Sequence, residues 1–327
     1  MVKQRLAVIN EFGPPEVLTV VERELPDPGP GEVQLRQTAI GLNYLDVVQR
    51  KGGGYRLPLP TSLGFEAAGV VEKIGPGVTS RKPGERVVYM NAGIGAYASH
   101  RNVPADKLVA LPDTVSDEAA ATLFFKGLTA QYLLRKTYVV QSGDLLLVHS
   151  AAGGVGQILT RWATALGASV VGTTGSPQKA EAATAAGCTA VVDLRDPEWP
   201  SAFLAATGGR KARVVYDAIG KDTLLKSMDC TAQFGLVVSY GLASGKADPI
   251  DTELLNEKGC LYLTRPSVFP HNATPEQLTA NANDLFDAIA KGYVKVDIGH
   301  RFTLDQIAMA HQAAEARTAP GAILITP

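Results

Sequence analysis

Cysteine and histidine are scarce in this chain of 327 residues, which has three cysteines and five histidines. Cys188, Cys230 and Cys260 are odd in number, far apart and without a Cys-x-x-Cys spacing, which argues against a disulfide framework, a redox pair or a zinc knot. We expect them to be small buried hydrophobic residues. The histidines show no HExxH or paired-ligand spacing, so we expect them on the surface or hydrogen-bonded in the core. The sequence therefore predicts no metal site.

An excess of one charge sign and long apolar runs are also missing. The formal net charge is -1, and no block of Lys and Arg offers a surface for nucleic acid or an anionic membrane. No stretch approaches the ~20 apolar residues that span a bilayer. The basic start at Lys3 and Arg5 is followed by a mixed segment instead of the apolar run of a signal peptide. We therefore expect a cytoplasmic protein that binds neither membranes nor nucleic acid.

What is present is enough apolar sequence for two domains, because hydrophobic residues make up 46% of the chain and charged residues only 19%. Between residues 5 and 112, short β-type runs alternate with glycine- and proline-rich turns, which is typical of a barrel or a sandwich. These runs are 6–9, 18–21, 33–37, 68–71 and 86–89. The first part of the chain is therefore predicted to be β-rich.

After about Asp117 the pattern changes to helices that alternate with apolar strands, which predicts an α/β doubly wound parallel sheet with helices on both faces. The expected strands are 145–150, 169–173, 190–193, 213–217, 236–240 and 260–263. Further on, residues 274–277 have the composition of a capping box and predict a helix to about Lys291. A shorter helix should begin at 303–306, and a closing strand should cover 322–325.

The first strand of this α/β region runs into a glycine turn and then into a helix. Set against the G-x-G-x-x-G pattern, the matching positions are Ala151, Gly153 and Gly156, so the first glycine is replaced. A side chain at Gly153 would keep the backbone away from a pyrophosphate, and Gly156 lets the helix pack closely on the strand. The turn therefore predicts a dinucleotide site, although glycine-rich turns also occur without ligands.

The nature of the dinucleotide follows from the second strand. In NAD enzymes an acidic residue ~20 positions further on binds the ribose 2′-hydroxyl, and here that position is Thr173. The segment 172–179 offers hydroxyl groups, a helix start and Lys179, with no carboxylate to repel a 2′-phosphate. We therefore expect NADPH in preference to NADH. Taken alone, Lys179 would be a solvated surface charge.

Several further motifs carry a family resemblance along the whole chain. They are 41–46 (GLNYLD), 64–69 (GFEAAG), 126–130 (KGLTA), 215–217 (VYD) and 261–267 (LYLTRPS). With them the chain resembles the zeta-crystallin-like NADPH:quinone oxidoreductases, a zinc-independent branch of the medium-chain dehydrogenase/reductase superfamily. The resemblance implies a GroES-like β-barrel catalytic domain over 1–125, completed by 267–327, and a Rossmann dinucleotide-binding domain over 126–266.

The resemblance also implies roles for individual residues. Those expected around the nicotinamide are Asn43, Tyr44, Asp46 and Thr129, and those around the pyrophosphate are Ser150, Gly153, Gly154 and Val155. Those expected at the adenosine half are Thr174, Gly175, Ser176, Lys179 and Arg317, and those along the rest of the cofactor channel are Tyr216, Tyr240, Gly241, Thr264 and Arg265. The expected catalytic residues are Asn43, Asp46 and Tyr55, which lies in a glycine-rich loop as a substrate gate. Turn formation at a strand end is the alternative role for Asn43 and Asp46.

The implied activity is NADPH-dependent, zinc-independent reduction of quinones by hydride transfer. Zinc-dependent relatives have a cysteine at the position of Asn43 and a histidine at that of Phe65, and without a Lewis acid alcohol dehydrogenation is disfavoured. Reduction of alkenal or enone double bonds and a non-catalytic, crystallin-like or RNA-binding role are the alternatives. The resemblance, together with an apolar edge strand at 260–264, also predicts a homodimer.

Overall fold

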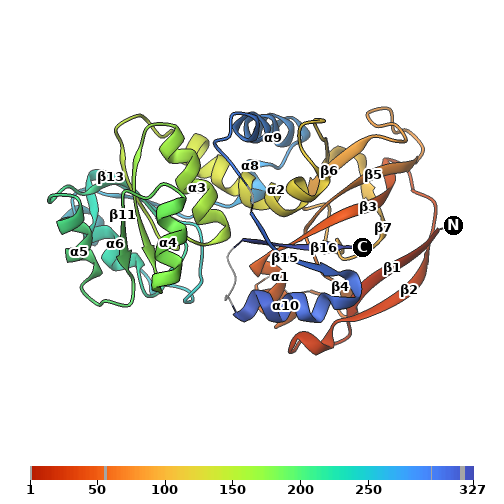
Figure 1. The fold of residues 1–327 in the computed structure, drawn as a ribbon, viewed down its shortest axis with the longest axis horizontal. Helices are drawn as coiled ribbons and strands as arrows, with labels where there is room; N and C mark the ends of the chain where they lie inside the picture. The colour runs from red at the N-terminus through yellow and green to blue at the C-terminus, as the bar shows by residue number, and fades with distance from the viewer. Residues whose placement is uncertain (1, 55–56, 296, 317–320) are drawn as a thin grey trace. The chain divides into compact units, whose positions relative to one another are not determined.

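The structure is a computed structural model that describes residues 2–54, 57–295, 297–316 and 321–327 (Figure 1). The chain divides into two compact units. Unit 1 consists of Met1–Lys126, Asn272–Ala290 and Val296–Pro327, and unit 2 consists of Gly127–His271 and Lys291–Lys295. The long helix α2 (Asp117–Tyr132) contributes residues to both.

Unit 1 is built mainly from strands. They are β1 (Val2–Ile9), β2 (Thr19–Leu25), β3 (Glu32–Leu42), β4 (Thr61–Ser62), β5 (Glu66–Ile74), β6 (Arg86–Met90), β7 (His100–Pro104), β8 (Leu108–Ala110), β15 (Ile298–Thr303) and β16 (Ala322–Thr326). Its helices besides α2 are α1 (Tyr44–Arg50), α9 (Pro275–Ala290) and α10 (Ile307–Ala316), with short 3-10 turns η1 (Pro15–Val17), η2 (Ala105–Lys107) and η4 (Leu304–Gln306). The β-rich first part predicted from the sequence is confirmed.

Two sheets form the core of unit 1. The larger has the order β15-β16-β3-β5-β6-β8 with β7 also paired to β3, and the smaller has the order β2-β1-β4. The apolar core lies around β3, where Val33, Leu35 and Ile40 are fully buried. β3 is longer than the predicted run at 33–37 because two irregularities let it bend and stay paired with β5 as far as Gly41. Its far end delivers the chain directly into α1.

Unit 2 is an α/β unit. Its strands are β9 (Leu145–Val148), β10 (Ser169–Thr174), β11 (Ala190–Asp193), β12 (Ala212–Asp217), β13 (Thr231–Ser239) and β14 (Tyr262–Thr264). Its helices, besides the end of α2, are α3 (Gly154–Ala165), α4 (Pro177–Ala185), α5 (Trp199–Ala206), α6 (Leu224–Asp229), α7 (Thr252–Glu257), α8 (Val268–His271) and the π-helical segment η3 (Leu133–Thr137).

All six strands of unit 2 are parallel, in the order β11-β10-β9-β12-β13-β14. Helices α3 and α4 pack together and contact β10, while α5 and α6 pack together as a second pair (Figure 1). The chain therefore adds strands first on one side of β9 and then on the other, so that its direction of winding reverses between β9 and β12. This is the doubly wound sheet predicted from the sequence, and such a reversal point is where these sheets bind ligands.

Local signals in the sequence have mixed outcomes. The capping box before α9 is confirmed, because Thr274 and Gln277 exchange hydrogen bonds of 3.3 Å in both directions. The expectation that all cysteines are buried is wrong for Cys260, which is exposed with a φ of 53° just before β14. Cys188 and Cys230 are buried as expected. Within the described residues, no helix combines the length and the apolar character needed to cross a bilayer.

Candidate active site

The carboxyl ends of the six parallel strands gather most of the residues that the sequence assigns to a cofactor. The segment 150–155 follows β9, the segment 174–179 follows β10, and Tyr240 and Gly241 follow β13. Tyr216 lies at the end of β12, and Thr264 and Arg265 lie at the end of β14. Because parallel strands end on one edge of a sheet, the topology of unit 2 places these segments along the same edge.

The glycine turn after β9 is shaped for close approach of a ligand to the backbone. Ser150 turns the chain with a φ of 55°, and Gly153 caps α3 in an extended conformation. A Cβ on Gly156 would lie 2.2 Å from the Ser150 carbonyl oxygen, so only glycine fits there. Gly153 and Gly154 are exposed, and the first turn of α3 carries no acidic side chain. The free N–H groups of this twelve-residue helix therefore fit a pyrophosphate.

The end of β10 corrects one interpretation of the sequence. Thr173 is not at the position of a ribose-binding acid, because its side chain is fully buried and lies 2.8 Å from His149 Nδ1. The strand ends one residue later, and its exposed continuation is Gly175 followed by the N-cap Ser176. The Ser176 hydroxyl accepts a bond of 3.4 Å from the Lys179 N–H, and the Lys179 side chain is exposed. The segment 174–179 therefore offers hydroxyls and a cation to an anionic group.

Beneath these loops lies a buried polar cluster that we call the Asp217 hub: His149, Thr173, Asp217, Thr223 and Ser227. The Asp217 carboxylate accepts two bonds from the Thr223 hydroxyl, at 2.8 and 2.9 Å, and one of 2.9 Å from Ser227. It also accepts the N–H groups of residues 219 and 220 at 2.8 and 3.0 Å. A buried carboxylate with this many donors holds the loop after β12 in one conformation.

His149 joins the Asp217 hub to the glycine turn. Its Nε2 lies 2.9 Å from the Ser227 hydroxyl, its Nδ1 bonds Thr173, and its ring packs edge-on against Trp199. Burial lowers the pKa of His149, against an opposing effect of the Asp217 charge, so the imidazole is neutral at neutral pH. The hub thus connects the ends of β9, β10 and β12 through hydrogen bonds at the base of the candidate dinucleotide site.

The candidate cofactor residues at the ends of β12 and β13 differ in how far their side chains are exposed. Tyr216 has no exposed surface and donates its hydroxyl to the Leu133 carbonyl at 3.1 Å, so its side chain is occupied within unit 2. Tyr240 is half-buried and donates its N–H to the Asp217 carbonyl at 2.8 Å. A Cβ on Gly241 would lie 2.3 Å from the Ala218 carbonyl oxygen. The loops after β12 and β13 therefore touch each other only because residue 241 is glycine.

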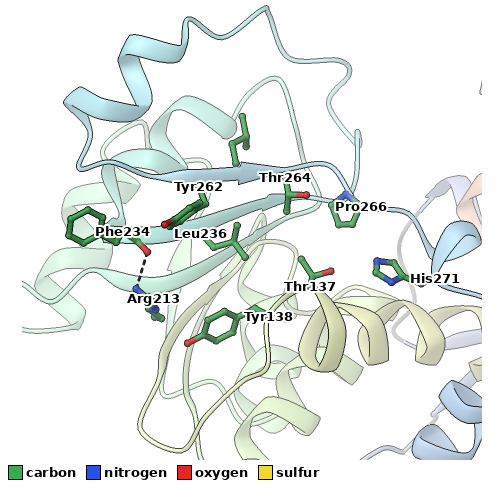
Figure 2. Close-up of a pocket in the computed structure, with 10 residues that line it drawn as sticks. Thr137, Tyr138, Arg213, Phe234, Leu236, Tyr262, Thr264, Pro266 and His271 are labelled. Carbon is green, nitrogen blue, oxygen red and sulfur yellow. Dashed lines mark hydrogen bonds between the residues drawn. The ribbon is translucent and has the colours of Figure 1, made fainter. Parts of the chain in front are cut away.

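A pocket of about 500 Å³ lies along the edge strand β14 of unit 2 (Figure 2). Tyr138, Phe234 and Tyr262 surround its outer end, where the Arg213 guanidinium lies 5.9 Å from the centre of the Tyr138 ring and donates to the Phe234 carbonyl at 2.9 Å. Thr264 and Pro266 line the other end. None of the glycine-turn residues lines this pocket, so it is a feature of the sheet edge and distinct from the dinucleotide turn.

In unit 1 a second buried cluster forms where β3 passes into α1. We call it the Lys126 cluster: Asn43, Glu66 and Lys126. The Asn43 Nδ2 donates to Glu66 Oε1 at 2.8 Å, and Lys126 Nζ donates to Asn43 Oδ1 at 2.7 Å and to Glu66 Oε1 at 3.3 Å. Asn43 and Glu66 are buried, and Lys126 exposes 13% of its side chain. The candidate catalytic residue Asn43 is therefore held between a cation and an anion.

Asp46 belongs to a chain of buried groups that we call the Asp46 chain: Asp46, Tyr97, His311 and Arg50. Asp46 Oδ2 accepts the Asn43 N–H and the Tyr97 hydroxyl, both at 2.8 Å, and His311 Nε2 lies 3.1 Å from that hydroxyl. Arg50 lies 3.3 Å from His311 Nδ1, and because a guanidinium only donates, the imidazole proton is on Nε2. Asp46 thus caps α1 and ties it to α10.

Burial shifts two pKa values in the Asp46 chain in opposite directions. It raises the pKa of Asp46 to about 7, although the Asn43 N–H and the Tyr97 hydroxyl stabilise the ionised form. It lowers the pKa of His311 to about 3, and the Arg50 charge acts in the same direction. Asp46 Oδ1 is buried and has no hydrogen-bond partner in the described part of the chain. Asp46 therefore titrates near neutrality while His311 stays uncharged.

The remaining candidates lie in different surroundings. Tyr44 is 45% exposed at the start of α1, and Thr129 is buried on α2. Tyr55 and Arg317 lie outside the described residues. Ser150 and Val155 are half-buried around the glycine turn, and Arg265 is exposed. Across residues 2–54, 57–295, 297–316 and 321–327, no three His, Cys, Asp or Glu side chains are grouped so as to hold a metal ion.

Sequence reasoning missed the charged partners that surround the candidates. Glu66, Lys126 and Asp217 enter the sequence analysis only as parts of family motifs, and His149 only as a histidine expected on the surface or hydrogen-bonded in the core. A signal was present, because Lys126 directly follows the uncharged, mostly apolar run 119–125 and Glu66 lies between Phe65 and Ala67. Charged residues in such surroundings are buried only when they are paired. The sequence could therefore have predicted that each has a partner, though not which one.

Comparison with known proteins agrees with this architecture. The model of the alcohol dehydrogenase GroES-like domain matches residues 29–113, and that of the zinc-binding dehydrogenase family matches residues 154–276. The structure of the Escherichia coli quinone oxidoreductase complexed with NADPH is 44% identical, with a TM-score of 0.94, over 99% of this chain and 100% of that one. The class is thus an oxidoreductase with a GroES-like domain and a Rossmann domain.

Curated relatives define the family more closely. Quinone oxidoreductase 1 of Escherichia coli (strain K12) is 44% identical over 320 residues, which are 97% of this chain and 98% of the relative. The 2-haloacrylate reductase of a Burkholderia species is 41% identical over 327 residues, with 98% of both chains covered. The chain belongs to the quinone oxidoreductase family of the medium-chain dehydrogenases/reductases, and the resemblance inferred from its motifs is confirmed.

Proposed function

We propose that this chain catalyses the NADPH-dependent reduction of quinones. The observation that carries the proposal is the carboxyl edge of the unit 2 sheet, where a glycine turn of the dinucleotide type stands next to an acid-free segment with Ser176 and Lys179. When bound, NADPH supplies a hydride, the quinone takes up its two electrons, and water supplies the second proton. Membership of the quinone oxidoreductase family supports the same reaction.

The residues of unit 2 bind and orient the cofactor in this proposal. The N–H groups of Gly154 and Val155 bind the pyrophosphate, since α3 begins there without an acidic side chain. Gly153 donates its own N–H to the Ser150 carbonyl at 2.8 Å, and its lack of a side chain lets the pyrophosphate approach the backbone. Thr174, Gly175, Ser176 and Lys179 bind the adenosine half with its 2′-phosphate, and Ser150, Thr129, Tyr240, Gly241, Thr264 and Arg265 contact the rest. Arg317, which belongs to unit 1 and lies outside the described residues, is proposed for the adenosine half from the family resemblance alone. Tyr216 contributes only its backbone, because its side chain is fully buried.

Unit 1 acts on the acceptor side of the reaction. Asn43 donates a side-chain hydrogen bond to an oxygen of the quinone or of the nicotinamide amide. Tyr44 and Tyr55 are near it in the sequence. Asp46 accepts the backbone N–H of Asn43 and so keeps α1 in place. A quinone that has taken up a hydride is a stabilised hydroquinone anion that water can protonate. Proximity and orientation are then the main contributions, and no side chain has to transfer an essential proton.

Zinc is not required in this account. Asn43 and Phe65 stand where zinc-dependent relatives have ligands, and Asn43 is already bonded to Glu66 and Lys126. The ammonium group of Lys126 lies 3.3 Å from the Glu66 carboxylate and balances its charge, so no metal ion is needed there. Metal analysis of the purified protein should find no stoichiometric zinc, and a chelator should leave the turnover unchanged. Activity that a chelator abolishes and zinc restores would contradict the proposal.

Reduction of an activated carbon–carbon double bond is the second candidate reaction. It is favoured by one specific finding, the 41% identity to a 2-haloacrylate reductase over nearly the whole of both chains. Both reactions need the same hydride donor and an acceptor oxygen that develops negative charge, so the cofactor residues do not separate them. The acceptor preference separates them. We give priority to quinones because two relatives with nearly the same coverage and higher identity, 44% and 46%, carry that name.

We also propose a homodimer formed through β14. Among the described strands β14 is the last of its sheet, so one of its sides pairs with none of them, and Tyr262 on it is 64% exposed. Together with Phe234, which is 52% exposed beside the same pocket (Figure 2), it gives an apolar edge that a second copy would cover. Tyr262→Lys should yield monomers in sedimentation, while Leu225→Lys, at a similarly exposed residue of α6, should not. A wild-type monomer at micromolar concentration would refute the dimer.

A cytoplasmic location is part of the proposal. It is supported by three free cysteines, one of them exposed, because exposed thiols persist in reducing compartments. Cell fractionation with activity measurement tests it, and activity recovered mainly in a secreted or membrane fraction would contradict it.

The direct test of the proposed function is the oxidation of NADPH by the purified protein when a benzoquinone or naphthoquinone is added. We expect turnover with NADPH and much less with NADH at the same concentration. Tyr55→Phe should lower the turnover only by a modest factor, because this account requires no essential proton from Tyr55. Absence of quinone-dependent NADPH oxidation would refute the function, and a loss greater than about 10³-fold in Tyr55→Phe would show an essential group.

A further inference from the structure

Lys126 is a half-buried cation, and the hydrogen-bond partners that its Nζ faces are all acceptors. Besides Asn43 Oδ1 at 2.7 Å and Glu66 Oε1 at 3.3 Å, its Nζ faces the carbonyl oxygens of Thr122 at 3.2 Å and Leu42 at 3.4 Å. Leu42 ends β3, Asn43 is the N-cap of α1, Glu66 begins β5, and Thr122 lies in α2. The shortest contact is to the neutral amide of Asn43, so the ammonium is directed at Asn43 at least as closely as at its counter-ion.

The two charged neighbours determine the orientation of the Asn43 amide. Lys126 can only donate, so the atom 2.7 Å from its Nζ is the carbonyl oxygen, and an ionised Glu66 can only accept, so the atom 2.8 Å from its Oε1 is the nitrogen. A flipped amide would set its NH₂ against the ammonium and its oxygen against the carboxylate. The second hydrogen of Nδ2 has no acceptor among the residues that the structure describes. Asn43 therefore has one N–H left to offer.

Glu66 is fixed from the opposite side. Its Oε2 accepts the Phe125 N–H at 2.6 Å, and a Cβ on Gly41 would lie 2.7 Å from its Oε1. The same Cβ would lie 2.0 Å from the Ala121 carbonyl oxygen, so the glycine in β3 lets α2 and the carboxylate approach the strand closely. The Lys126 cluster is thus assembled by three elements that leave its members little freedom.

We propose that Lys126 is a positioning residue for quinone reduction: paired with Glu66, it locks the Asn43 amide so that an N–H, and not the carbonyl, is offered to the acceptor oxygen that gains negative charge. The inference rests on the proposed function for the identity of that oxygen. A preoriented N–H stabilises a developing oxyanion without reorganisation during the reaction, whereas a carbonyl in the same place would repel it. Removing Lys126 frees the amide to rotate.

The orientation of the Asn43 amide can be tested by NMR, without measuring enzyme activity. Protein labelled with ¹⁵N in asparagine side chains, with Asn43→Ala for assignment, should show two well-separated Asn43 NH₂ proton signals, one of them slow to exchange because it is bonded to the buried Glu66. In Lys126→Met both signals should move together or exchange faster by about tenfold. Lys73→Met is the matched control, since Lys73 also forms an ion pair in unit 1, with Asp27 at 2.6 Å, but on the surface. Unchanged Asn43 signals in folded Lys126→Met would overturn the proposal.

The kinetic consequence is tested by a double-mutant cycle. Lys126→Met should lower kcat for the quinone about tenfold, less than the roughly 10²–10³-fold loss when an oxyanion donor itself is removed, because Asn43 is still present. KM for NADPH should stay within about twofold of wild type. In the Asn43→Ala background, Lys126→Met should lower kcat by less than about twofold, because the amide that Lys126 orients is no longer present. A purely structural ion pair would give additive losses. Additive losses, or a single-mutant kcat within about twofold of wild type, would overturn the proposal.

A destabilised variant does not prevent the test. If Lys126→Met leaves Glu66 as an uncompensated charge and the protein is poorly folded, Lys126→Met/Glu66→Gln removes both charges together. This double variant should fold, lose the fixed Asn43 orientation and keep the low kcat, and wild-type signals in it would overturn the proposal. If the wild type reduces no quinone, the proposed function fails, and the Asn43 signals still decide whether Lys126 sets the amide.

Discussion

The Asp217 hub of unit 2 and the polar groups of unit 1 solve the same problem, buried charge, in different ways. The Asp217 hub surrounds one carboxylate with neutral hydroxyl and N–H donors and a neutral imidazole. Unit 1 opposes full charges in the Lys126 cluster, and in the Asp46 chain it leaves Asp46 with a pKa of about 7. The first arrangement is a fixed support for loops, whereas the second responds to charge and pH. In the proposed function, the first arrangement supports the cofactor loops and the second acts on the acceptor side.

The largest expected effect comes from removing the centre of the Asp217 hub. Asp217→Ala leaves the N–H groups of residues 219 and 220 and two hydroxyls buried without their acceptor, which should lower the free energy of unfolding by about 3–5 kcal/mol. Urea denaturation measures it. Asp222→Ala, on the exposed part of the same loop, should change the stability by less than about 0.5 kcal/mol. Equal effects of the two would show that the hub does not support the loops.

The pH dependence of stability should separate the two titrating members of the Asp46 chain. Asp46 has a raised pKa, so its contribution is complete below about pH 4 and is lost as the pH rises towards 7. His311 has a lowered pKa, so its contribution falls away as the pH drops from about 6.5 towards 3. Between about pH 4 and 6.5 the two slopes, each at most about 1.4 kcal/mol per pH unit, largely cancel.

Single substitutions should uncover these opposing slopes. Asp46→Asn keeps an acceptor for the Asn43 N–H and the Tyr97 hydroxyl but cannot titrate, so its stability should rise with pH across the window. His311→Gln should show the reverse, a fall in stability from pH 4 to 6.5. Denaturation midpoints measured at half-unit steps provide the comparison. Parallel pH profiles of the wild type and both variants would contradict the opposed shifts.

The close packing of the glycine turn predicts a smaller effect. Gly156→Ala brings a Cβ within 2.2 Å of the Ser150 carbonyl oxygen, so α3 must shift, with a loss of about 1–3 kcal/mol. Gly175→Ala is the control, because a Cβ there has no neighbour within 4 Å. Thermal unfolding without cofactor measures both. If Gly175→Ala lowers the stability as much as Gly156→Ala, the loss does not come from the close contact of the added Cβ with its neighbours.

The smallest expected effect is at the exposed Lys179. Lys179→Ala should weaken NADPH binding by about 1.5 kcal/mol, the lower end for a charge-assisted hydrogen bond, because the side chain is solvated in the free protein. NADH binding should be unchanged, because NADH lacks the 2′-phosphate that Lys179 is proposed to contact. Titration calorimetry with the two cofactors gives both values. Equal affinity of the wild type for NADPH and NADH would contradict the assigned role.

The sequence predicts the fold of both units well because period and turn signals are local. The alternation after Asp117 gives the parallel sheet, and residues 274–277 give the start of α9. Prediction fails in two cases: where a residue's role depends on the exact residue at which a strand ends, and where it depends on a partner far away in the sequence. The count from Gly153 arrives at Thr173, one residue before the strand ends, and so at a side chain that points to His149. Lys126 meets Glu66 across 60 positions of sequence, which no local pattern specifies.

The central claim is tested most directly by the acceptor preference with NADPH as the donor. The measurement is kcat/KM for a benzoquinone or naphthoquinone against that for a 2-alkenal and a 2-haloacrylate, with the same protein, buffer and NADPH concentration. The account predicts a clear preference for the quinone, because orientation of a flat acceptor and one N–H from Asn43 are all that its reduction requires. A clear preference for the activated double bonds would contradict it and assign the chain to double-bond reduction.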